Sequence, residues 1–185
     1  AARVDVRESM DDPCFYTDVN LIGSINVLEC CRRHKVRKVL YASSGGAVYG
    51  EPDELPVEEN HPIRPLDHYG ASKHHVEHHL HLYEHNYGLR FTTMRYPNVY
   101  GPRQNSSGEA GVVAVFAKRM LTRKKVIING TGDQERDFIF VKDVARANLL
   151  ALSKGESKEY NLGHGQGISI NELFEKMACV TSYGQ

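Results

Sequence analysis

A tyrosine and a lysine four residues apart, Tyr69 and Lys73, are the side chains whose types and spacing best suit proton transfer. If the stretch from Asp67 begins a helix, these two side chains share one helical face. A fixed positive charge beside a phenol favours the phenolate, so it lowers the tyrosine pKa from about 10 toward the range of a proton shuttle. Such pairs also occur by chance on exposed helices, so the surrounding elements must decide the role of this one.

The first half of the chain alternates between helix and strand patterns. Apolar residues at helical spacing predict a helix over about 15–34, and a short apolar run predicts a buried strand over 38–43. The strand leads into a loop beginning Ser44-Gly45-Gly46, where small residues allow close approach to the backbone. We expect a proline-rich surface loop over 51–66, the helix opened by Tyr69, and a strand over 89–96. This alternation predicts an α/β fold with a parallel sheet, whose ligands bind beyond the strand carboxyl ends.

Beyond Pro102 the pattern changes to that of a smaller, mixed region. The elements expected there are a polar loop (103–111), a helix (112–121), a strand (126–128), a helix capped by Asp143 and running to about Ser153, and a strand (159–162). Ser169 and Glu172 form a capping box, with Ile168 placed to contact Leu173, so a last helix should begin there.

The composition excludes several classes of protein. The chain has 185 residues, 41% of them apolar, with 23 basic and 23 acidic residues. It can bury a core, and the balanced charge gives no field to attract nucleic acid or an anionic membrane. No apolar run is long enough to span a membrane, and residues 1–5 lack the features of a secretory signal. We therefore expect a cytoplasmic protein.

The cysteines and histidines offer rival chemistry. Cys14, Cys30, Cys31 and Cys179 show no disulfide or zinc spacing, so we expect reduced, packed thiols. Six histidines crowd the helix after Lys73, and His74 to His78 fits the His-x-x-Glu-His pattern of a zinc protease. No distal third ligand is apparent in the sequence, so we expect no metal and interpret this as a solvated or interfacial helix face.

Six motifs occur in a recognisable order and spacing: Ala1-Ala2, Asn20 to Ser24, Ser43 to Gly50, Tyr69 to Lys73, Arg95 to Pro102 and Arg136 to Phe138. Together they resemble the extended short-chain dehydrogenase/reductases, and within them the UDP-glucose 4-epimerases and related NAD-dependent sugar-nucleotide epimerases. The resemblance implies a Rossmann-like parallel sheet, here partial with its first strands missing, and a smaller mixed substrate-binding region. Residues 1–100 would be the C-terminal part of the NAD-binding domain. Residues 101–185 would mostly bind substrate, with a strand near 158–162 returning to the sheet.

One part of the family pattern is missing. The glycine loop Gly-x-x-Gly-x-x-Gly, which holds the nucleotide after the first strand, is not in this sequence, and neither is the C-terminal arginine that contacts the diphosphate. The chain therefore resembles the middle of such an enzyme, and we expect it to be inactive by itself.

The resemblance also implies a mechanism. Tyr69 would take the proton from the 4-hydroxyl of a UDP-hexose while hydride passes to NAD, and Lys73 would hold the nicotinamide ribose. A transient 4-keto sugar would then receive the hydride on its other face, inverting the hydroxyl. Ser44 would share the proton with Tyr69, and Ser43 is the alternative, because the two following glycines blur the alignment.

The binding residues implied by the same resemblance fall into two groups. Those on the cofactor side are Ala2, Asn20, Ser43, Tyr69, Lys73 and Pro97, and those on the substrate side are Ser44, Tyr69, Asn98, Val112, Val113 and Arg136. Plainer roles remain open for several of them. Asn20 can be a structural helix residue, Asn98 a turn residue, the two valines core residues, and Arg136 the partner of an acid such as Asp133 or Asp137.

Two alternative functions and one partner, a second copy of the chain, are also considered. Dehydratase and decarboxylase relatives carry an acid just before Val-Tyr-Gly, whereas this chain has Gly45, Gly46 and Ala47, which favours plain epimerisation. A non-catalytic dimerising module derived from the family is the second alternative. In the family, the helices matching 15–34 and 69–86 commonly pair across a dimer, which implies a homodimer here.

Overall fold

The computed structural model describes residues 2–107, 111–155 and 157–184. The chain forms two compact units. The first comprises Ala1–Tyr96 and Arg146–Leu162, and the second comprises Pro97–Ala145 and Gly163–Gln185.

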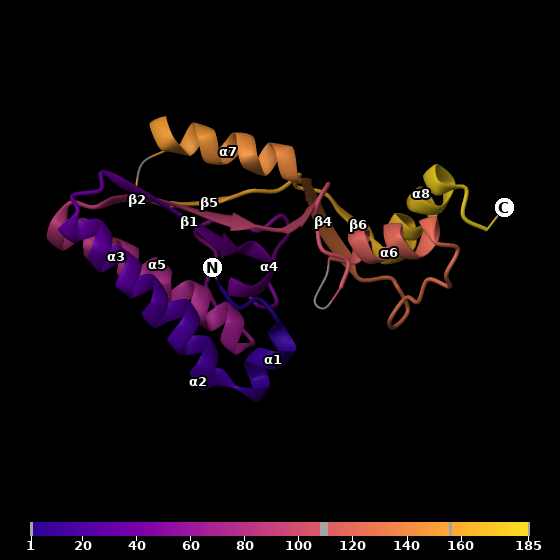
Figure 1. Cartoon of the computed structure of the whole chain (residues 1–185), viewed down its shortest axis with the longest axis horizontal. Coiled ribbons are helices and arrows are strands. Elements are labelled where there is room, and N and C mark those ends of the chain that lie inside the picture. Colours follow the sequence, from indigo (N-terminus) through magenta and orange to yellow (C-terminus); the bar gives the residue numbers. More distant parts are fainter. Residues whose placement is uncertain (1, 108–110, 156, 185) are drawn as a thin grey trace. The chain divides into compact units, whose positions relative to one another are not determined.

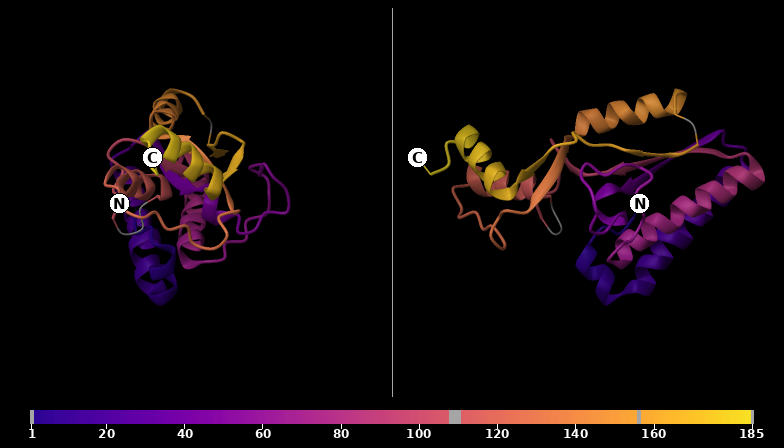
Figure 2. Two further views of the ribbon diagram at one scale, coloured as in Figure 1. Left: turned by 90° about the vertical axis from the view of Figure 1, so that its right-hand side faces the viewer. Right: turned by 180° about the vertical axis from the view of Figure 1, so that it is seen from behind.

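A parallel three-stranded sheet forms the centre of the first unit. Its strands are β1 (Lys38–Ser44), β2 (Arg90–Tyr96) and β5 (Glu159–Asn161), in the order β1-β2-β5. Helices α3 (Gly23–Arg33) and α5 (His68–Tyr87) cover one face and α7 (Val141–Ser153) covers the other (Figures 1 and 2). The predicted α/β fold with a parallel sheet is confirmed. In β1 and β2, Ser43 pairs with Arg95 and Ser44 with Tyr96, so the carboxyl ends of the two strands are level.

The helical region before the sheet is longer than the sequence pattern predicts. It contains α1 (Val6–Asp11), α2 (Pro13–Tyr16), the π-helix η1 (Thr17–Ile22) and α3 (Gly23–Arg33). The last three cover the predicted helix, whereas α1 was not predicted. The side chain of Asp5 caps α1 by accepting a hydrogen bond from the Glu8 N–H. This cap is a local signal of the kind that marks helix starts.

Helix α5 (His68–Tyr87) carries the Tyr69–Lys73 pair and has two well-formed ends. At its start, the Asp67 carboxylate accepts a hydrogen bond of 2.7 Å from the Gly70 N–H. At its end, Gly88 adopts the left-handed conformation (φ 67°) that suits glycine. Its apolar side packs against α3 and β2 through a buried cluster that includes Leu28, Val76, Leu80, Tyr83 and Phe91. Full burial of such side chains stabilises the fold by about 1.5–3 kcal/mol each.

The segment after β1 corrects the sequence interpretation, because Gly45–Val48 forms a helical turn, α4, rather than an open loop. This turn packs closely on the start of α5. A Cβ at Gly70 would lie 2.5 Å from the Ala47 carbonyl oxygen, so glycine at position 70 permits the contact. The following stretch to Leu66 has no helix or strand, which confirms the predicted surface loop.

The second unit is built on a mixed sheet. The strands β3 (Asn98–Tyr100), β4 (Glu135–Phe140) and β6 (Gly167–Ser169) have the order β3-β4-β6, with the first pair parallel and the second antiparallel. The helices are α6 (Val112–Leu121), α7 (Val141–Ser153), which continues into the first unit, and α8 (Ile170–Thr181). Phe116, Met120, Ile170 and Leu173 form its buried cluster.

Several predictions for this unit were right and others were wrong. Ser169 caps α8 by accepting from the Glu172 N–H at 3.0 Å, as the capping box predicts. The prediction of a strand over 126–128 was wrong, because Val126 and Ile128 pack on the buried cluster without pairing with another strand. The prediction that Asp143 caps this helix was also wrong, because α7 begins two residues earlier and Asp143 lies in its first turn. The short strands β3, β4 and β6 were not predicted.

The structure also bears on membrane-spanning helices and on the environment of the cysteines. In the part of the chain that the structure describes, no helix is both long and apolar enough to cross a membrane. The four cysteines are free thiols, but Cys14, Cys30 and Cys179 are exposed, so the expectation of packed thiols was wrong for these three. Helix α3 turns Cys30 outward and only the neighbouring Cys31 toward the core.

Candidate active site

Tyr69 and Ser44 come together at the carboxyl edge of the first unit's sheet. Ser44 is the last residue of β1, and Tyr69 lies in the first turn of α5. The side chain of Ser44 lies close enough to the Tyr69 phenol to affect its pKa. Burial raises the pKa of Tyr69, the Ser44 side chain lowers it, and the nearby Asp67 charge raises it, with a net increase. The sequence-based expectation of a lowered tyrosine pKa was therefore wrong for the chain by itself.

Lys73 is not among the groups that shift the pKa of Tyr69, and its ammonium binds β1 instead. The Nζ atom donates to the Ala42 carbonyl oxygen at 2.6 Å and lies 4.8 Å from the centre of the Tyr41 ring. The side chain is 7% exposed. Burial lowers the pKa of Lys73 to about 8, and the negative charge of Glu77 opposes that decrease. Lys73 is thus a largely charged but readily titrated group one helical turn from Tyr69.

A buried ion pair between Glu77 and Arg95 lies next to these groups and was not predicted as part of the site. The two side chains are 2% and 4% exposed, and Arg95 Nη2 lies 2.7 Å from Glu77 Oε2. Ser43 donates to Glu77 Oε1 at 2.6 Å, and His74 Nδ1 lies 3.2 Å from Oε2. Burial raises the pKa of Glu77, but hydrogen bonds from His74, Arg95 and Ser43 outweigh this effect and lower it to about 2.

A sequence signal for this pair existed. Glu77 follows Val76 and precedes Leu80 by three residues, so helical spacing places it beside the apolar face of α5. A charge in such a position requires a partner. The alternation of β2 places Arg95 on the same face as the buried Phe91, which makes Arg95 a candidate for that partner.

Arg95 also binds the loop that follows α4. Its Nη1 atom donates to the Tyr49 hydroxyl at 2.7 Å and to the Glu59 carbonyl oxygen at 3.2 Å. The Tyr49 hydroxyl in turn donates to Asn161 Oδ1 at 2.8 Å. Since Asn161 ends β5, one arginine links the ends of β2 and β5, helix α5 and the proline-rich loop.

Asn20 has a structural role in the first unit. It is 2% exposed and exchanges two hydrogen bonds with the Arg3 backbone, at 2.8 and 3.1 Å. Its Nδ2 atom also donates to Ser72 Oγ on α5 at 2.9 Å. Asn20 therefore fixes the first residues of the chain to η1 and α5. The neighbouring Ala2 is exposed and outside any helix or strand, whereas Ala1 lies outside the described residues.

The candidates in the second unit are less constrained. Asn98 is exposed and donates to the Asp137 carbonyl oxygen at 3.4 Å, and exposed Arg136 donates to the Glu135 carbonyl oxygen at 2.7 Å. Asp137 accepts instead from the backbone of His164 and Gly165. Residues of partial burial complete the set: Pro97 precedes β3, and Val112 and Val113 pack on the Phe116 cluster.

The histidine-rich face of α5 does not form a metal centre in the structure. Among residues 2–107, 111–155 and 157–184, no three histidine, cysteine or acidic side chains converge in a way that could hold a metal ion. His74 lies against Glu77, and His81 Nε2 lies 2.8 Å from Glu159 Oε1. The glutamate of the His-x-x-Glu-His pattern thus belongs to the Arg95 pair.

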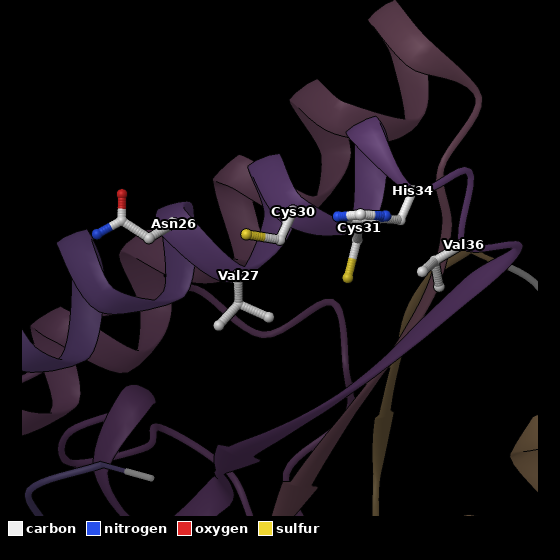
Figure 3. A pocket seen from close by; sticks show the side chains of 6 residues that line it. All are labelled: Asn26, Val27, Cys30, Cys31, His34 and Val36. Atoms are coloured by element: carbon white, nitrogen blue, oxygen red, sulfur yellow. The ribbon is translucent and has the colours of Figure 1, made fainter.

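A shallow hollow of about 340 Å³ lies along α3, away from the Tyr69–Lys73 pair. Figure 3 shows the side chains that line it: Asn26, Val27, Cys30, Cys31, His34 and Val36. None of the candidate catalytic residues contributes to it, so it is not the candidate active site.

Comparison with protein families identifies the chain. Residues 1–163 match the sequence model of the NAD dependent epimerase/dehydratase family. The chain belongs to this family. One relative is the protein named putative UDP-glucose 4-epimerase of Methanocaldococcus jannaschii. It is 49% identical to this chain over 175 residues, which are 95% of this chain and 57% of that protein.

Solved structures of family members agree with the fold. UDP-glucose 4-epimerase of Thermotoga maritima with UDP-glucose has a TM-score of 0.98 and 41% identity, over 100% of this chain and 60% of that one. The NAD complex of the Thermus thermophilus UDP-glucose 4-epimerase has a TM-score of 0.92 and 43% identity, over 100% and 61%. The chain therefore spans about three fifths of the length of these family members.

Proposed function

We propose that the natural protein is an NAD-dependent 4-epimerase of UDP-hexoses, of the UDP-glucose/UDP-galactose type, and that this chain supplies its proton-transfer residues. The observation that carries the proposal is the convergence of Ser44, Tyr69 and Lys73 at the carboxyl edge of the parallel sheet. This edge is where α/β sheets of this kind bind ligands. The family of the chain and its similarity to UDP-glucose 4-epimerases support the same reaction.

Tyr69 is the proposed acid and base. It takes the proton from the sugar 4-hydroxyl and returns a proton to the same oxygen after the configuration has changed. Ser44, whose side chain lies beside the phenol, shares this proton. Because burial raises the pKa of Tyr69, ionisation needs positive charge nearby, and Lys73, one helical turn away on α5, is the proposed source of that charge. Ser43 is not chosen for this role, since its hydroxyl donates to Glu77.

The same edge fits the hydroxyl groups of a nicotinamide ribose. It offers a buried ammonium at Lys73 and a phenol at Tyr69, and a Cβ built on Gly46 would contact no atom from elsewhere in the fold within 4 Å. When bound, NAD supplies a reversible acceptor for the sugar C4 hydride. In this proposal Lys73 and Tyr69 hold the ribose. Pro97, Ala2 and Ser43 are the other proposed cofactor-side residues, and the described contacts of Asn20 make its contribution structural.

The substrate side of the proposal belongs to the second unit. Asn98 and Arg136 are exposed, and an arginine is suited to a diphosphate because its planar guanidinium can donate several hydrogen bonds at once. Val112 and Val113 would lie near the uracil. Gly45, Gly46 and Ala47 carry no group that exchanges protons, which favours epimerisation over dehydration or decarboxylation.

We further propose that the natural protein is a cytoplasmic homodimer that pairs through α3 and α5. Both helices and η1 retain exposed apolar side chains outside the core: Ile22 (45% exposed), Val27 (58%), Leu82 (53%) and Tyr87 (57%). The hollow beside Val27 lies on the same helix. A sedimentation measurement should give a dimer, and Val27→Glu should shift it toward the monomer. A monomer at all concentrations would refute this proposal.

A turnover assay tests the enzymatic proposal. The natural protein, purified with the NAD it retains, is incubated separately with UDP-galactose, UDP-N-acetylgalactosamine and UDP-galacturonate, and the 4-epimers are separated by chromatography. Conversion of at least one to its 4-epimer is expected, with UDP-glucose from UDP-galactose as the first product sought. Native mass spectrometry on the same sample detects the NAD. Bound NAD without conversion of any of the three would overturn the proposed reaction.

A further inference from the structure

The buried carboxylate of Glu77 joins three elements at one point. It accepts from Ser43 on β1 at 2.6 Å and from Arg95 on β2 at 2.7 Å, and His74 on its own helix lies 3.2 Å away. At 2% exposure it is more deeply buried than Lys73. It is not one of the residues given a role in the proposed reaction.

A buried ion pair is by itself weak evidence for stability. Removing two charges from water costs several kcal/mol each, and apolar residues of similar volume often stabilise a fold equally well. What such a pair does provide is fixed geometry, because both charges need particular hydrogen-bond partners. The positions of those partners therefore indicate what the pair is for.

Glu77 and its partner Ser43 are close in the chain to the proposed catalytic groups. Ser43 directly precedes Ser44, and Lys73 is one helical turn before Glu77 on α5. Arg95 pairs in register with Ser43 across the two strands. A displacement of the Glu77 carboxylate would thus change the contact between the end of β1 and the start of α5.

The charges around Glu77 and Lys73 are also limited in number. Described titratable groups around them are Arg95 from β2, Tyr41 from β1, Tyr49 beyond α4, and His74, His78 and Tyr69 on α5. The positive Arg95 is paired with Glu77, and the tyrosines are neutral because burial raises the pKa of Tyr41, Tyr49 and Tyr69. Among these described residues Glu77 carries the carboxylate, and its negative charge favours the protonated form of Lys73.

We propose that Glu77 is a positioning residue of the catalytic centre. It fixes the end of β1 that carries Ser44 against the face of α5 that carries Tyr69 and Lys73, and it stabilises the Lys73 ammonium electrostatically. The catalytic consequence rests on the proposed function, whereas the effect on Lys73 does not.

The test compares Glu77→Gln and Glu77→Asp with Glu84→Gln in the natural protein. Glu84 is a partly exposed glutamate on the same helix, two turns further on, and serves as the matched control. The titration of Lys73 is followed by NMR on protein labelled with ¹³C at the lysine Cε, with the signal assigned by its loss in Lys73→Arg. Steady-state kcat and KM are measured with the same preparations.

Glu77→Gln should move the Lys73 midpoint to lower pH by on the order of one unit, because it removes the neighbouring negative charge. It should also lower kcat by about tenfold or more while KM changes little, since a small misplacement of catalytic groups affects the chemical step. Glu77→Asp keeps the charge and should restore the midpoint, and Glu84→Gln should behave as wild type. A wild-type midpoint in Glu77→Gln would overturn the electrostatic part.

Ser43→Ala provides a second variant if Glu77→Gln does not fold. It breaks the link between Glu77 and β1 but keeps the Arg95 pair and the charge. We expect a lower kcat with an unchanged Lys73 midpoint, and a wild-type kcat would overturn the positioning of β1. If the natural protein has no epimerase activity, the Lys73 titration still decides the electrostatic part, so failure of the proposed function and of this inference are distinguishable.

Discussion

The candidate residues of the two units differ in how firmly the fold holds them. In the first unit, Lys73 and the Glu77–Arg95 pair are buried, and each is hydrogen-bonded to another element. In the second unit, Asn98 and Arg136 are exposed and donate to backbone carbonyl groups. The difference fits two tasks. Proton transfer needs fixed neighbours that set each pKa, whereas binding a large charged ligand needs groups that the ligand can reach.

The strongest test of the first unit is Tyr69→Phe. It removes only the phenolic hydroxyl, which is the proposed acid and base, so kcat should fall by about 10²–10⁴-fold. The assay is conversion of UDP-galactose to UDP-glucose by the natural protein. Circular dichroism and the NAD content serve as controls for folding. Turnover equal to wild type would remove Tyr69 from the mechanism.

Arg95→Met should produce the largest loss of stability. The substitution keeps much of the side-chain volume but leaves the Glu77 charge buried without its partner, which costs about 3–5 kcal/mol. Urea unfolding of the natural protein measures the change in unfolding free energy. Arg136→Met is the matched control from the exposed group and should lie within about 0.5 kcal/mol of wild type. Equal effects of the two would contradict the contrast between the units.

Acid should weaken the wild type more than Glu77→Gln. The pKa of Glu77 is lowered from 4.5 to about 2 in the folded protein, so its contribution is present above pH 4.5 and is lost as the pH falls through about 2. The unfolding free energy of the wild type should therefore decrease by on the order of 3 kcal/mol more than that of the variant over this interval. Parallel curves from urea titrations at several pH values would argue against a native-state carboxylate.

Arg136→Met should affect substrate binding rather than folding. A hydrogen bond to a charged group contributes about 1.5–3 kcal/mol, so KM for the UDP-sugar should rise roughly 10- to 100-fold. A small change in kcat would place the residue in binding, and an unchanged KM would show that Arg136 does not contact the diphosphate. Arg146→Met, another arginine of the chain that has no proposed role, is the control.

The smallest expected effect is that of Ser169→Ala. Ser169 caps α8 through its hydrogen bond to the Glu172 N–H, and the loss of such a cap costs about 1 kcal/mol. Thermal unfolding should show a modest decrease in the melting temperature with unchanged kcat. A change in kcat would show that this helix affects the catalytic groups, which would contradict the assignment of catalysis to the first unit.

Local signals made much of the fold predictable. The Asp67 cap and the Gly88 terminus define α5 within the helix itself, and the Ser169 cap defines the start of α8. The apolar run of β1 has a strand pattern that needs no distant information. The error at Val126 to Ile128 has the opposite origin, because β-branched residues suit a strand only where a partner strand is present. The three-residue strands β3 and β6 are too short to show a period.

The sequence by itself determined the family resemblance, the helix that carries Tyr69 and Lys73 on one face, and the parallel sheet beside it. Only the tertiary structure decided which serine lies beside which group: Ser43 donates to Glu77, and Ser44 lies beside Tyr69. It also decided that Glu77 pairs with Arg95 and that burial raises the pKa of Tyr69. The physical reason is the distance along the chain between the residues that interact. Caps and helical faces depend on residues three or four positions apart, whereas burial and the Ser43–Glu77 contact depend on segments 34 residues apart in the chain.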